Sequence, residues 1–302
     1  MGVTADSRAL AVPPATVRGL VVEVTDLLAH STRVDDAATE ARELVSALLG
    51  VQRSWPILNG DSPIEEAWRQ RALAAATRRL LGAPLAYCVG RAPFRHMMVE
   101  IDERVLIPRP ETEQLVDVAL SLVGAIAGGV AVDVGTGSGA IALALATEAS
   151  FERVLATDIS LDALAVARRN ADVLRRELRA AVEFRQGSLL APLGDLRARL
   201  IVSNPPYIAN HEAATLPASV RDWEPPIALL SGPDGLCATA RLVRQAAGRL
   251  VPGGALALEA DSRRAGAVAD LARSDPRFTD VDVIKDLAGR ERFVVARRKE
   301  DE

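Results

Sequence analysis

The stretch "VAVDVGTGSGAIALALA", residues 130–146, decides the fold class of this 302-residue chain. Residues 130–134 form an apolar run typical of a buried strand, and an apolar run of helical length begins after residue 139. Between them, Gly135, Gly137 and Gly139 allow a sharp turn in which backbone amides can approach a ligand closely. The stretch therefore predicts a strand, a ligand-binding loop and a helix of a parallel α/β sheet.

The same alternation continues on the C-terminal side of this loop. Strands are expected near residues 153–157, 181–185, 199–203 and 254–259, and helices near 138–148, 160–177 and 236–250. Such alternation is typical of a doubly wound parallel sheet. Residues 278–298 depart from it, because they contain two β-like runs joined by a short turn, and they predict an antiparallel hairpin at the end of the sheet.

The N-terminal side predicts a small helical domain over residues 1–82. Apolar residues recur at helical spacing within 15–31, Asp35 or Asp36 can cap a second helix that Gly50 ends, and Ser62 is expected to cap a third. Short β-like runs broken by Gly90 and Pro93 indicate a β-hairpin linker over residues 83–108. The predicted α/β domain, residues 109–302, then begins with a helix after Pro110.

Composition excludes several classes of function. The net charge is −4, aromatic residues make up 3% of the chain, and neither value suits a protein that binds nucleic acid broadly. Cys88 and Cys237 lie far apart, and the histidines show no ligand spacing, so no metal site is expected. We find no signal peptide and no apolar run of about 20 residues, so the sequence predicts a cytoplasmic protein that does not enter a membrane.

Acidic residues flank the glycine loop and bear on the choice of cofactor. Asp158 follows the next predicted strand, where a carboxylate can accept hydrogen bonds from the hydroxyls of a ribose. Asp133 precedes the loop, where an anion repels the pyrophosphate of NAD and suits the ammonium or sulfonium of S-adenosylmethionine (AdoMet). The glycine spacing also departs from that of NAD-binding loops. AdoMet is therefore the predicted cofactor, although Asp133 could instead cap the loop.

The segment "NPPY", Asn204–Tyr207, directly follows the strand predicted at 199–203. Two prolines cannot continue a sheet ladder, so they form a stiff corner at the edge where ligands bind. The side-chain oxygen of Asn204 and the carbonyl of Pro205 can accept both protons of a planar NH2 group, and Tyr207 can cover its face. This arrangement favours an amino-group methyltransferase over a simple turn, and leaves open whether the substrate is adenine or a glutamine side chain.

Several segments resemble the N5-glutamine methyltransferases that modify peptide chain release factors. The matching pieces are "APLAYCVG" (83–90), "VLIPRPETE" (105–113), "DVGTGSGAIALALA" (133–146), "NPPYI" (204–208), "VRDWEPPIALLSGPDGL" (220–236) and "DLAGRERFVVAR" (286–297). The corner also occurs in adenine methyltransferases, so the segments at 105–113 and 220–236 carry the discrimination. The resemblance implies a seven-stranded AdoMet-dependent methyltransferase sheet of the Rossmann type, with an antiparallel final hairpin and a helical N-terminal domain.

The resemblance also implies roles for individual residues. Residues Gly135, Thr136, Gly137, Ser138 and Gly139, with Asp158 and Asn204, would contact AdoMet, whose product is S-adenosylhomocysteine. Asn204, Pro205, Pro206 and Tyr207 would hold the glutamine of a Gly-Gly-Gln loop, with Asn204, Pro205 and Tyr207 as the catalytic residues. The N-terminal bundle would grip a class 1 release factor, and no direct contact with nucleic acid is expected.

Two segments depart from the family pattern. Ser188, followed by Leu189, stands after the third strand where the family commonly has an acidic residue, so a hydroxyl or a backbone amide would replace that carboxylate at the adenine of AdoMet. The segment after the fifth strand keeps Glu259 but lacks a Gly-x-x-Gln stretch. A different protein glutamine, such as one on a ribosomal protein, adenine-N6 methylation of nucleic acid, and a non-enzymatic binding module remain the alternatives.

Overall fold

A computed structural model describes residues 15–124 and 128–301 of the chain, so the first 14 residues of the predicted helical domain lie outside the described residues. The chain divides into two compact units, Met1–Val89 and Gly90–Glu302. The division falls after the short helix that follows residue 82. Each unit has its own arrangement of elements and is described by itself.

The first unit is helical. Its helices are α1 (Val17–Leu28), α2 (Ala37–Leu49), α3 (Trp55–Leu58), α4 (Glu66–Leu80) and α5 (Leu85–Val89). The amide of Thr39 donates to the Asp36 side chain at the start of α2, and Gly50 ends this helix with a φ of 72°. Leu20, Val24 and Leu28 of α1 are buried, and so are Leu44 and Val45 of α2, which gives this unit a core of its own.

The start of α4 differs from the sequence expectation. Ser62 does not cap this helix, which begins at Glu66, because Pro63 forms an antiparallel bridge with Thr16, just before α1. The amide of Ile64 donates to the carbonyl of Ala15 at 2.7 Å, and that of Val17 donates to the carbonyl of Ser62 at 3.0 Å. Long-range backbone pairing therefore overrides a local capping signal.

The second unit opens with the predicted hairpin, formed by β1 (Arg91–Phe94) and β2 (Met97–Glu100) in antiparallel register. Buried Asn170 of α8 (Leu161–Val173) fixes this hairpin. Its Nδ2 donates to the carbonyls of Glu100 and Ser138, both at 2.9 Å, and its Oδ1 accepts from the amide of Glu100 at 2.7 Å. One side chain thus ties the hairpin to the glycine loop.

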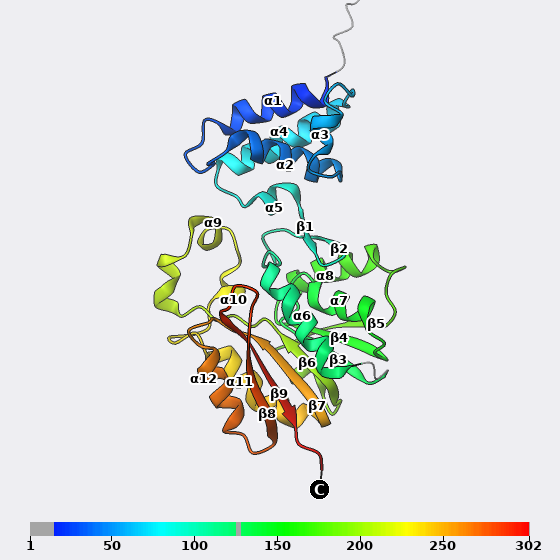
Figure 1. The fold of residues 1–302 in the computed structure, drawn as a ribbon, viewed down its shortest axis with the longest axis vertical. Helices are drawn as coiled ribbons and strands as arrows, with labels where there is room; N and C mark the ends of the chain where they lie inside the picture. The colour runs from blue at the N-terminus through cyan, green and yellow to red at the C-terminus, as the bar shows by residue number, and fades with distance from the viewer. Residues whose placement is uncertain (1–14, 125–127, 302) are drawn as a thin grey trace, which may run out of the picture. The chain divides into compact units, whose positions relative to one another are not determined.

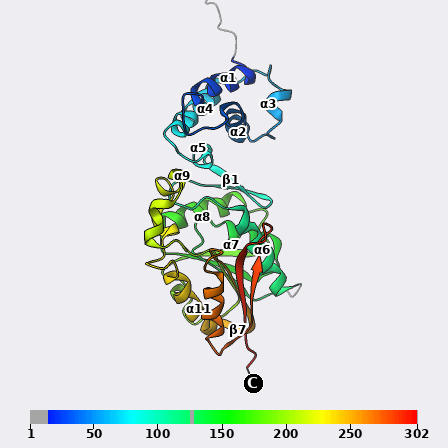
Figure 2. The same ribbon diagram turned by 60° about the vertical axis from the view of Figure 1, so that its left-hand side comes forward.

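A seven-stranded sheet forms the centre of the second unit in the part of the chain that the structure describes. Its strands are β3 (Val130–Val134), β4 (Arg153–Asp158), β5 (Ala181–Gln186), β6 (Ala198–Ser203), β7 (Leu250–Glu259), β8 (Phe278–Lys285) and β9 (Glu291–Arg298). Their order is β5-β4-β3-β6-β7-β9-β8 (Figure 1), and Figure 2 shows the same sheet after a turn of 60°. Within this sheet, the strands β3 to β7 are parallel to one another, and β9 runs antiparallel to both β7 and β8. The predicted α/β sheet with its antiparallel final hairpin is confirmed.

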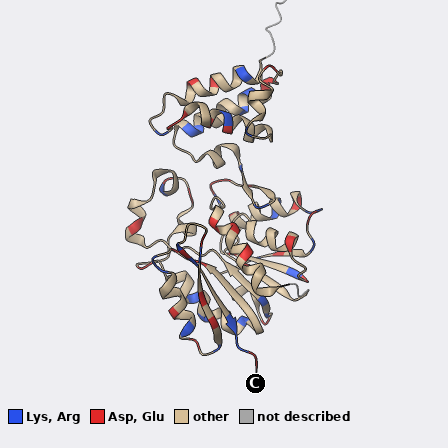
Figure 3. Cartoon of the chain, viewed as in Figure 1, with Lys and Arg blue, Asp and Glu red and all other residues tan. Residues whose placement is uncertain are grey.

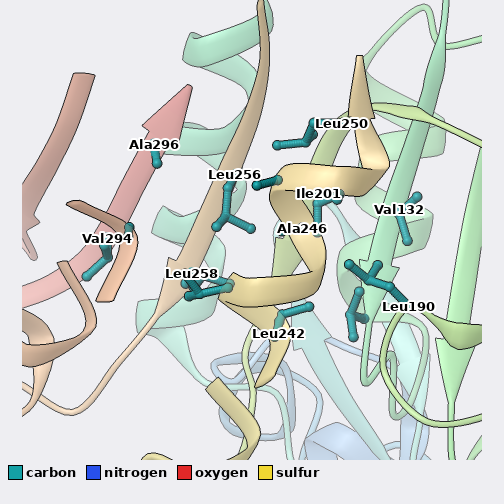
Figure 4. Packing of buried hydrophobic residues seen from close by; sticks show 14 of the residues in the cluster. Val132, Leu190, Ile201, Leu242, Ala246, Leu250, Leu256, Leu258, Val294 and Ala296 are labelled. Carbon is teal, nitrogen blue, oxygen red and sulfur yellow. The ribbon is translucent and has the colours of Figure 1, made fainter. Parts of the chain in front are cut away.

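Helices cover both faces of this sheet. One face carries α6 (Pro110–Val123), α7 (Ala140–Glu148) and α8, and the other carries α11 (Cys237–Arg249) and α12 (Ala265–Arg273), as Figure 1 shows. Short elements connect them: η1 (Ala191–Leu193), η2 (Asn210–Thr215), α9 (Ala218–Arg221) and α10 (Pro226–Leu229). Figure 4 shows Leu242 and Ala246 of α11 beside Ile201 and Leu256 of the sheet, within the core of this unit.

This topology gathers the predicted site residues at one edge. The strands β3, β4 and β6 are parallel neighbours, so their carboxyl ends lie side by side. The glycine loop follows β3, Asp158 ends β4, and Asn204 follows β6. In open α/β sheets, ligands bind at this edge, where the chain order reverses.

Candidate active site

A cavity of about 300 Å³ lies at this edge of the sheet, entirely within the second unit. The glycine loop, the ends of β4 and β5, the corner after β6 and the segments before α6 and around α10 form its walls. The predicted residues that line it are Gly135, Thr136, Gly137, Ser138, Asp158, Ser188, Leu189, Asn204 and Pro206. Its volume lies at the lower end of the range for small-molecule sites.

Backbone hydrogen bonds fix the glycine loop to the neighbouring strand β4. Its glycines have φ values of 71°, 54° and 85° at positions 135, 137 and 139, and residues other than glycine rarely adopt such values. The amides of Gly135 and Thr136 both donate to the carbonyl of Thr157, at 2.8 and 2.9 Å. Gly139 is the N-cap of α7 and does not line the cavity, and a Cβ at this position would lie 3.2 Å from that of Ala167.

Asp158 lies on the cavity wall at the end of β4. Its Oδ2 accepts from the amide of Gly137 and its Oδ1 from the amide of Ser160, both at 2.9 Å. These bonds aim the carboxylate while leaving lone pairs on both oxygens for a ligand. Burial raises the pKa of Asp158 above its ordinary value.

Asp133 is placed differently from the sequence expectation. It is fully buried beneath the glycine loop and does not line the cavity. Its Oδ2 accepts from the hydroxyl of Thr136 at 2.6 Å and from the amide of Ala142 at 3.1 Å, and burial raises its pKa to about 7. The loop folds back over the end of β3 and its Thr136 hydroxyl donates to this carboxylate, which is the contact that the loop-capping alternative predicts.

Ser188 and Leu189 line the cavity on the far side of Asp158 from the glycine loop. The amide of Gly187 donates to the carbonyl of Asp158 at 2.9 Å, and the hydroxyl of Thr157 donates to the carbonyl of Leu189 at 3.0 Å. Leu189 has a φ of 53°, an uncommon conformation for leucine. The segment after β5 is therefore held against the end of β4, and it brings the hydroxyl-bearing Ser188 to the cavity instead of an acidic residue.

The corner after β6 is rigid. Asn204 and Pro206 line the cavity, whereas Pro205 is buried and Tyr207 lies outside the lining. The amide of Ile208 donates to the carbonyl of Leu229 at 2.9 Å, so the corner is braced against the chain around α10. Burial raises the pKa of Tyr207 to about 12, so its hydroxyl stays protonated and does not serve as a base near neutral pH.

Asn204 has a defined orientation. Its Nδ2 donates to Oγ1 of Thr112 in α6 at 3.1 Å, and that hydroxyl donates to Oε2 of Glu259 at the end of β7 at 2.8 Å. Among the described residues, none donates to Oδ1 of Asn204. The amide oxygen therefore stays available as an acceptor on a residue that lines the cavity.

Sequence reasoning about single residues missed Thr112, Glu259 and the ion pair between Arg109 and Glu224. Thr112 and Glu259 are buried, at 5% and 1% exposure, and Arg109 lies on the cavity wall. Thr112, Arg109 and Glu224 fall inside segments 105–113 and 220–236, whose resemblance to a family was the only available signal. Their pairing depends on contacts between distant parts of the chain.

Comparisons with known proteins show which family the chain belongs to. Family models match at residues 114–219, the "Methyltransferase small domain", and at residues 20–90, the "PrmC N-terminal domain". A release factor glutamine methyltransferase of Moorella thermoacetica is 41% identical over 89% of this chain and 94% of its own. The enzyme of the same name from Deinococcus radiodurans is 39% identical over 92% of this chain and 99% of its own. The chain belongs to the release factor glutamine methyltransferase family.

The fold of this methyltransferase also occurs among more distant enzymes. The catalytic domain of hMettl16, solved in complex with the MAT2A 3′UTR hairpin 6, is 17% identical and aligns over 85% of this chain and 93% of its own with a TM-score of 0.54. This likeness concerns the fold alone. Within residues 15–124 and 128–301, the methyltransferase has no helix that is both long and apolar enough to cross a membrane, and no group of three metal-ligating side chains.

Proposed function

We propose that this methyltransferase transfers a methyl group from AdoMet to the side-chain nitrogen, N5, of the glutamine in the Gly-Gly-Gln loop of class 1 release factors. The observation that carries the proposal is the fixed amide of Asn204, whose Nδ2 is bound by Thr112 and whose Oδ1 remains an acceptor at the cavity. Relatives that carry this name, and that the chain matches over 94% and 99% of their own length, support the choice of substrate.

The residues around the cavity fit AdoMet. The glycine loop approaches the cavity with its backbone, and Asp158 keeps lone pairs that can accept from ribose hydroxyls. Ser188 and Leu189 would lie against the adenine, with a hydroxyl in place of the usual carboxylate. When bound, AdoMet would supply an electrophilic methyl group; the N–C bond would form as the S–C bond breaks, S-adenosylhomocysteine would leave, and the amide nitrogen would release one proton to water.

The corner would bind the substrate amide. Oδ1 of Asn204, on the cavity wall, would accept one proton of the glutamine NH2 group, and the backbone carbonyl of the buried Pro205 would accept the other, while Pro206 forms the adjacent wall. Two acceptors hold the nitrogen in one orientation, and fixed orientation can lower a barrier by several kcal/mol. Tyr207 lies outside the cavity lining, so in this proposal it supports the corner from behind.

The distribution of charged residues supports a protein substrate over nucleic acid bound through its phosphates. Lys and Arg positions are interspersed with Asp and Glu positions along both units (Figure 3), and the net charge is −4. A protein that binds nucleic acid through its phosphates concentrates positive charge on one surface. The first unit, which matches the PrmC N-terminal domain, would bind the release factor.

Transfer of label from methyl-labelled AdoMet tests the proposal. The purified methyltransferase is incubated with a class 1 release factor, with the same factor carrying Glu in place of the Gly-Gly-Gln glutamine, with ribosomal proteins, and with an adenine-containing oligonucleotide. We expect label on the unaltered release factor alone. Equal labelling of the altered factor, or labelling of only a ribosomal protein or the oligonucleotide, would contradict the proposed substrate.

A further inference from the structure

A relay of hydrogen bonds connects three distant parts of the chain, and two of its members, Asn204 and Thr112, line the cavity. Asn204 follows β6, Thr112 lies in the first turn of α6, and Glu259 ends β7. We propose that Glu259 is a positioning residue that determines, through Thr112, which end of the Asn204 amide faces the substrate. This inference rests on the proposed function, in which Oδ1 of Asn204 accepts a proton of the glutamine amide.

The direction of the relay follows from the chemistry of its last member. A carboxylate can only accept hydrogen bonds, whereas a hydroxyl both donates and accepts. Because the Thr112 hydroxyl gives its proton to Glu259, it can only accept from Asn204, and Nδ2 is the donor that Asn204 offers. An ionised Glu259 therefore fixes Nδ2 toward Thr112 and leaves Oδ1 for the substrate.

The surroundings of Glu259 do not account for its burial. Its charged and titratable neighbours are Arg292 on β9, Arg109 and Glu111 at the start of α6, and Tyr207. In the described part of the chain, none of the cations forms an ion pair with Glu259, and Thr112 is its hydrogen-bond partner. A buried carboxylate without an ion pair costs stability. The orienting role proposed here gives this buried charge a function.

A neutral side chain of the same shape at position 259 should no longer fix the orientation of the Asn204 amide. In the Glu259→Gln variant the new amide can donate to Thr112, whose hydroxyl then donates to Asn204 and attracts Oδ1 instead of Nδ2. The cavity would then face an NH2 group, which repels the NH2 group of the substrate. We expect kcat on release factor to fall roughly 10- to 100-fold, with the Kd for AdoMet unchanged.

A merely structural role predicts a different pattern. If Glu259 only stabilised the fold, Glu259→Gln would lower the melting temperature. Because a buried anion destabilises the wild-type protein at pH 8, we expect the melting temperature of Glu259→Gln to exceed that of the wild type at this pH. At pH 5, where the raised pKa leaves Glu259 protonated, we expect the two proteins to melt at similar temperatures. Loss of kcat together with a higher melting temperature at pH 8 is thus the expected signature.

Variants of Thr112 provide the matched controls. Thr112→Val removes the hydroxyl and keeps the shape, so it should lower kcat about as much as Glu259→Gln, and Thr112→Ser should restore most of it. The double variant Thr112→Val with Glu259→Gln should be no worse than either single variant, because both break the same relay. Additive losses, or an unchanged kcat in Glu259→Gln, would overturn the proposal.

One readout needs no substrate and separates this inference from the proposed function. The side-chain NH2 signal of Asn204, identified by its loss in Asn204→Asp, should show slow hydrogen exchange in the wild type and faster exchange in Glu259→Gln and Thr112→Val. Identical exchange in all three proteins would refute the relay. A wild-type protein that methylates no release factor would refute the proposed function, while this spectrum would still decide on the relay.

Discussion

Arg109 and Glu224 form an ion pair that connects the segment before α6 to the segment before α10, two parts of the chain 115 positions apart. The Glu224 side chain is 1% exposed and that of Arg109 is 34% exposed. Glu224 also accepts from the amide of Ile107 at 3.4 Å. Because Arg109 and Pro225 line the cavity, this pair fixes two of its walls relative to each other.

The two partners of this pair should differ in their effect on stability. Arg109→Met leaves a buried carboxylate without its cation and should lower the free energy of unfolding by about 1–3 kcal/mol. Glu224→Gln leaves unpaired only a guanidinium that is about one-third exposed, so it should cost less. Urea denaturation at pH 7.5 measures both variants, and a larger loss for Glu224→Gln would contradict the burial argument.

Asp158 should act on cofactor affinity. Asp158→Asn removes the charge but keeps the shape, so the Kd for AdoMet should rise roughly 10- to 100-fold from the loss of charge-assisted hydrogen bonds. Calorimetry measures the Kd, and Asp162→Asn, an exposed acid in the first turn of α8, is the matched control. An unchanged Kd in Asp158→Asn would mean that this carboxylate only braces Gly137 and Ser160.

Asp133 should make stability depend on pH. Its folded pKa is raised to about 7 from the ordinary value of 3.8, so the folded state binds more protons than the unfolded state between these values. The stability that this group contributes is present below about pH 4 and is lost as the pH rises through 7.

Asp133→Asn should therefore gain stability relative to the wild type as the pH rises, by on the order of 1 kcal/mol per pH unit between about pH 5 and 7. Urea denaturation of both proteins at several pH values gives this difference. Asp35→Asn, an exposed acid in the first unit, serves as the control that should show no such trend. A constant difference between Asp133→Asn and the wild type would mean that the carboxylate is ionised beneath the loop throughout.

The first unit should serve the protein substrate. A chain that begins at Gly90 keeps all the residues that line the cavity, so it should bind AdoMet with an unchanged Kd and methylate a short Gly-Gly-Gln peptide as the full chain does. Its kcat/KM on an intact release factor should fall at least about 10-fold with the loss of that contact surface. Equal activity of both chains on the intact factor would contradict the assigned role.

Local patterns were sufficient to predict the sheet. Strands buried on both faces are continuous apolar runs, so Val130–Val134 and Ala198–Ser203 are recognisable without a structure, and the hairpin Phe278–Arg298 is marked by its turn. The glycine spacing located the loop, and the ends of β4 and β6 located Asp158 and Asn204. Each of these signals is contained in a few neighbouring residues of the sequence.

Features that depend on distant contacts could not be predicted in this way. The helix after Ser62 begins late because residues 62–64 pair with the chain before α1. A local pattern can also leave two arrangements open, since Asp133 accepts from Thr136 and Ala142, which are close to it in the sequence, and the sequence alone allowed this carboxylate to face either the cavity or the loop. The relay from Asn204 to Glu259 joins three elements whose adjacency only the folded topology creates.

Turnover by Asn204→Ala tests the central claim, that the corner after β6 holds the substrate amide, most directly. Single-turnover methylation of release factor, with AdoMet affinity and release factor affinity measured in parallel, separates orientation from binding. We expect a loss of about 100-fold in rate, equivalent to roughly 2.7 kcal/mol, with much smaller changes in both affinities. A rate close to that of the wild type would contradict the account and leave Asn204–Tyr207 as a turn.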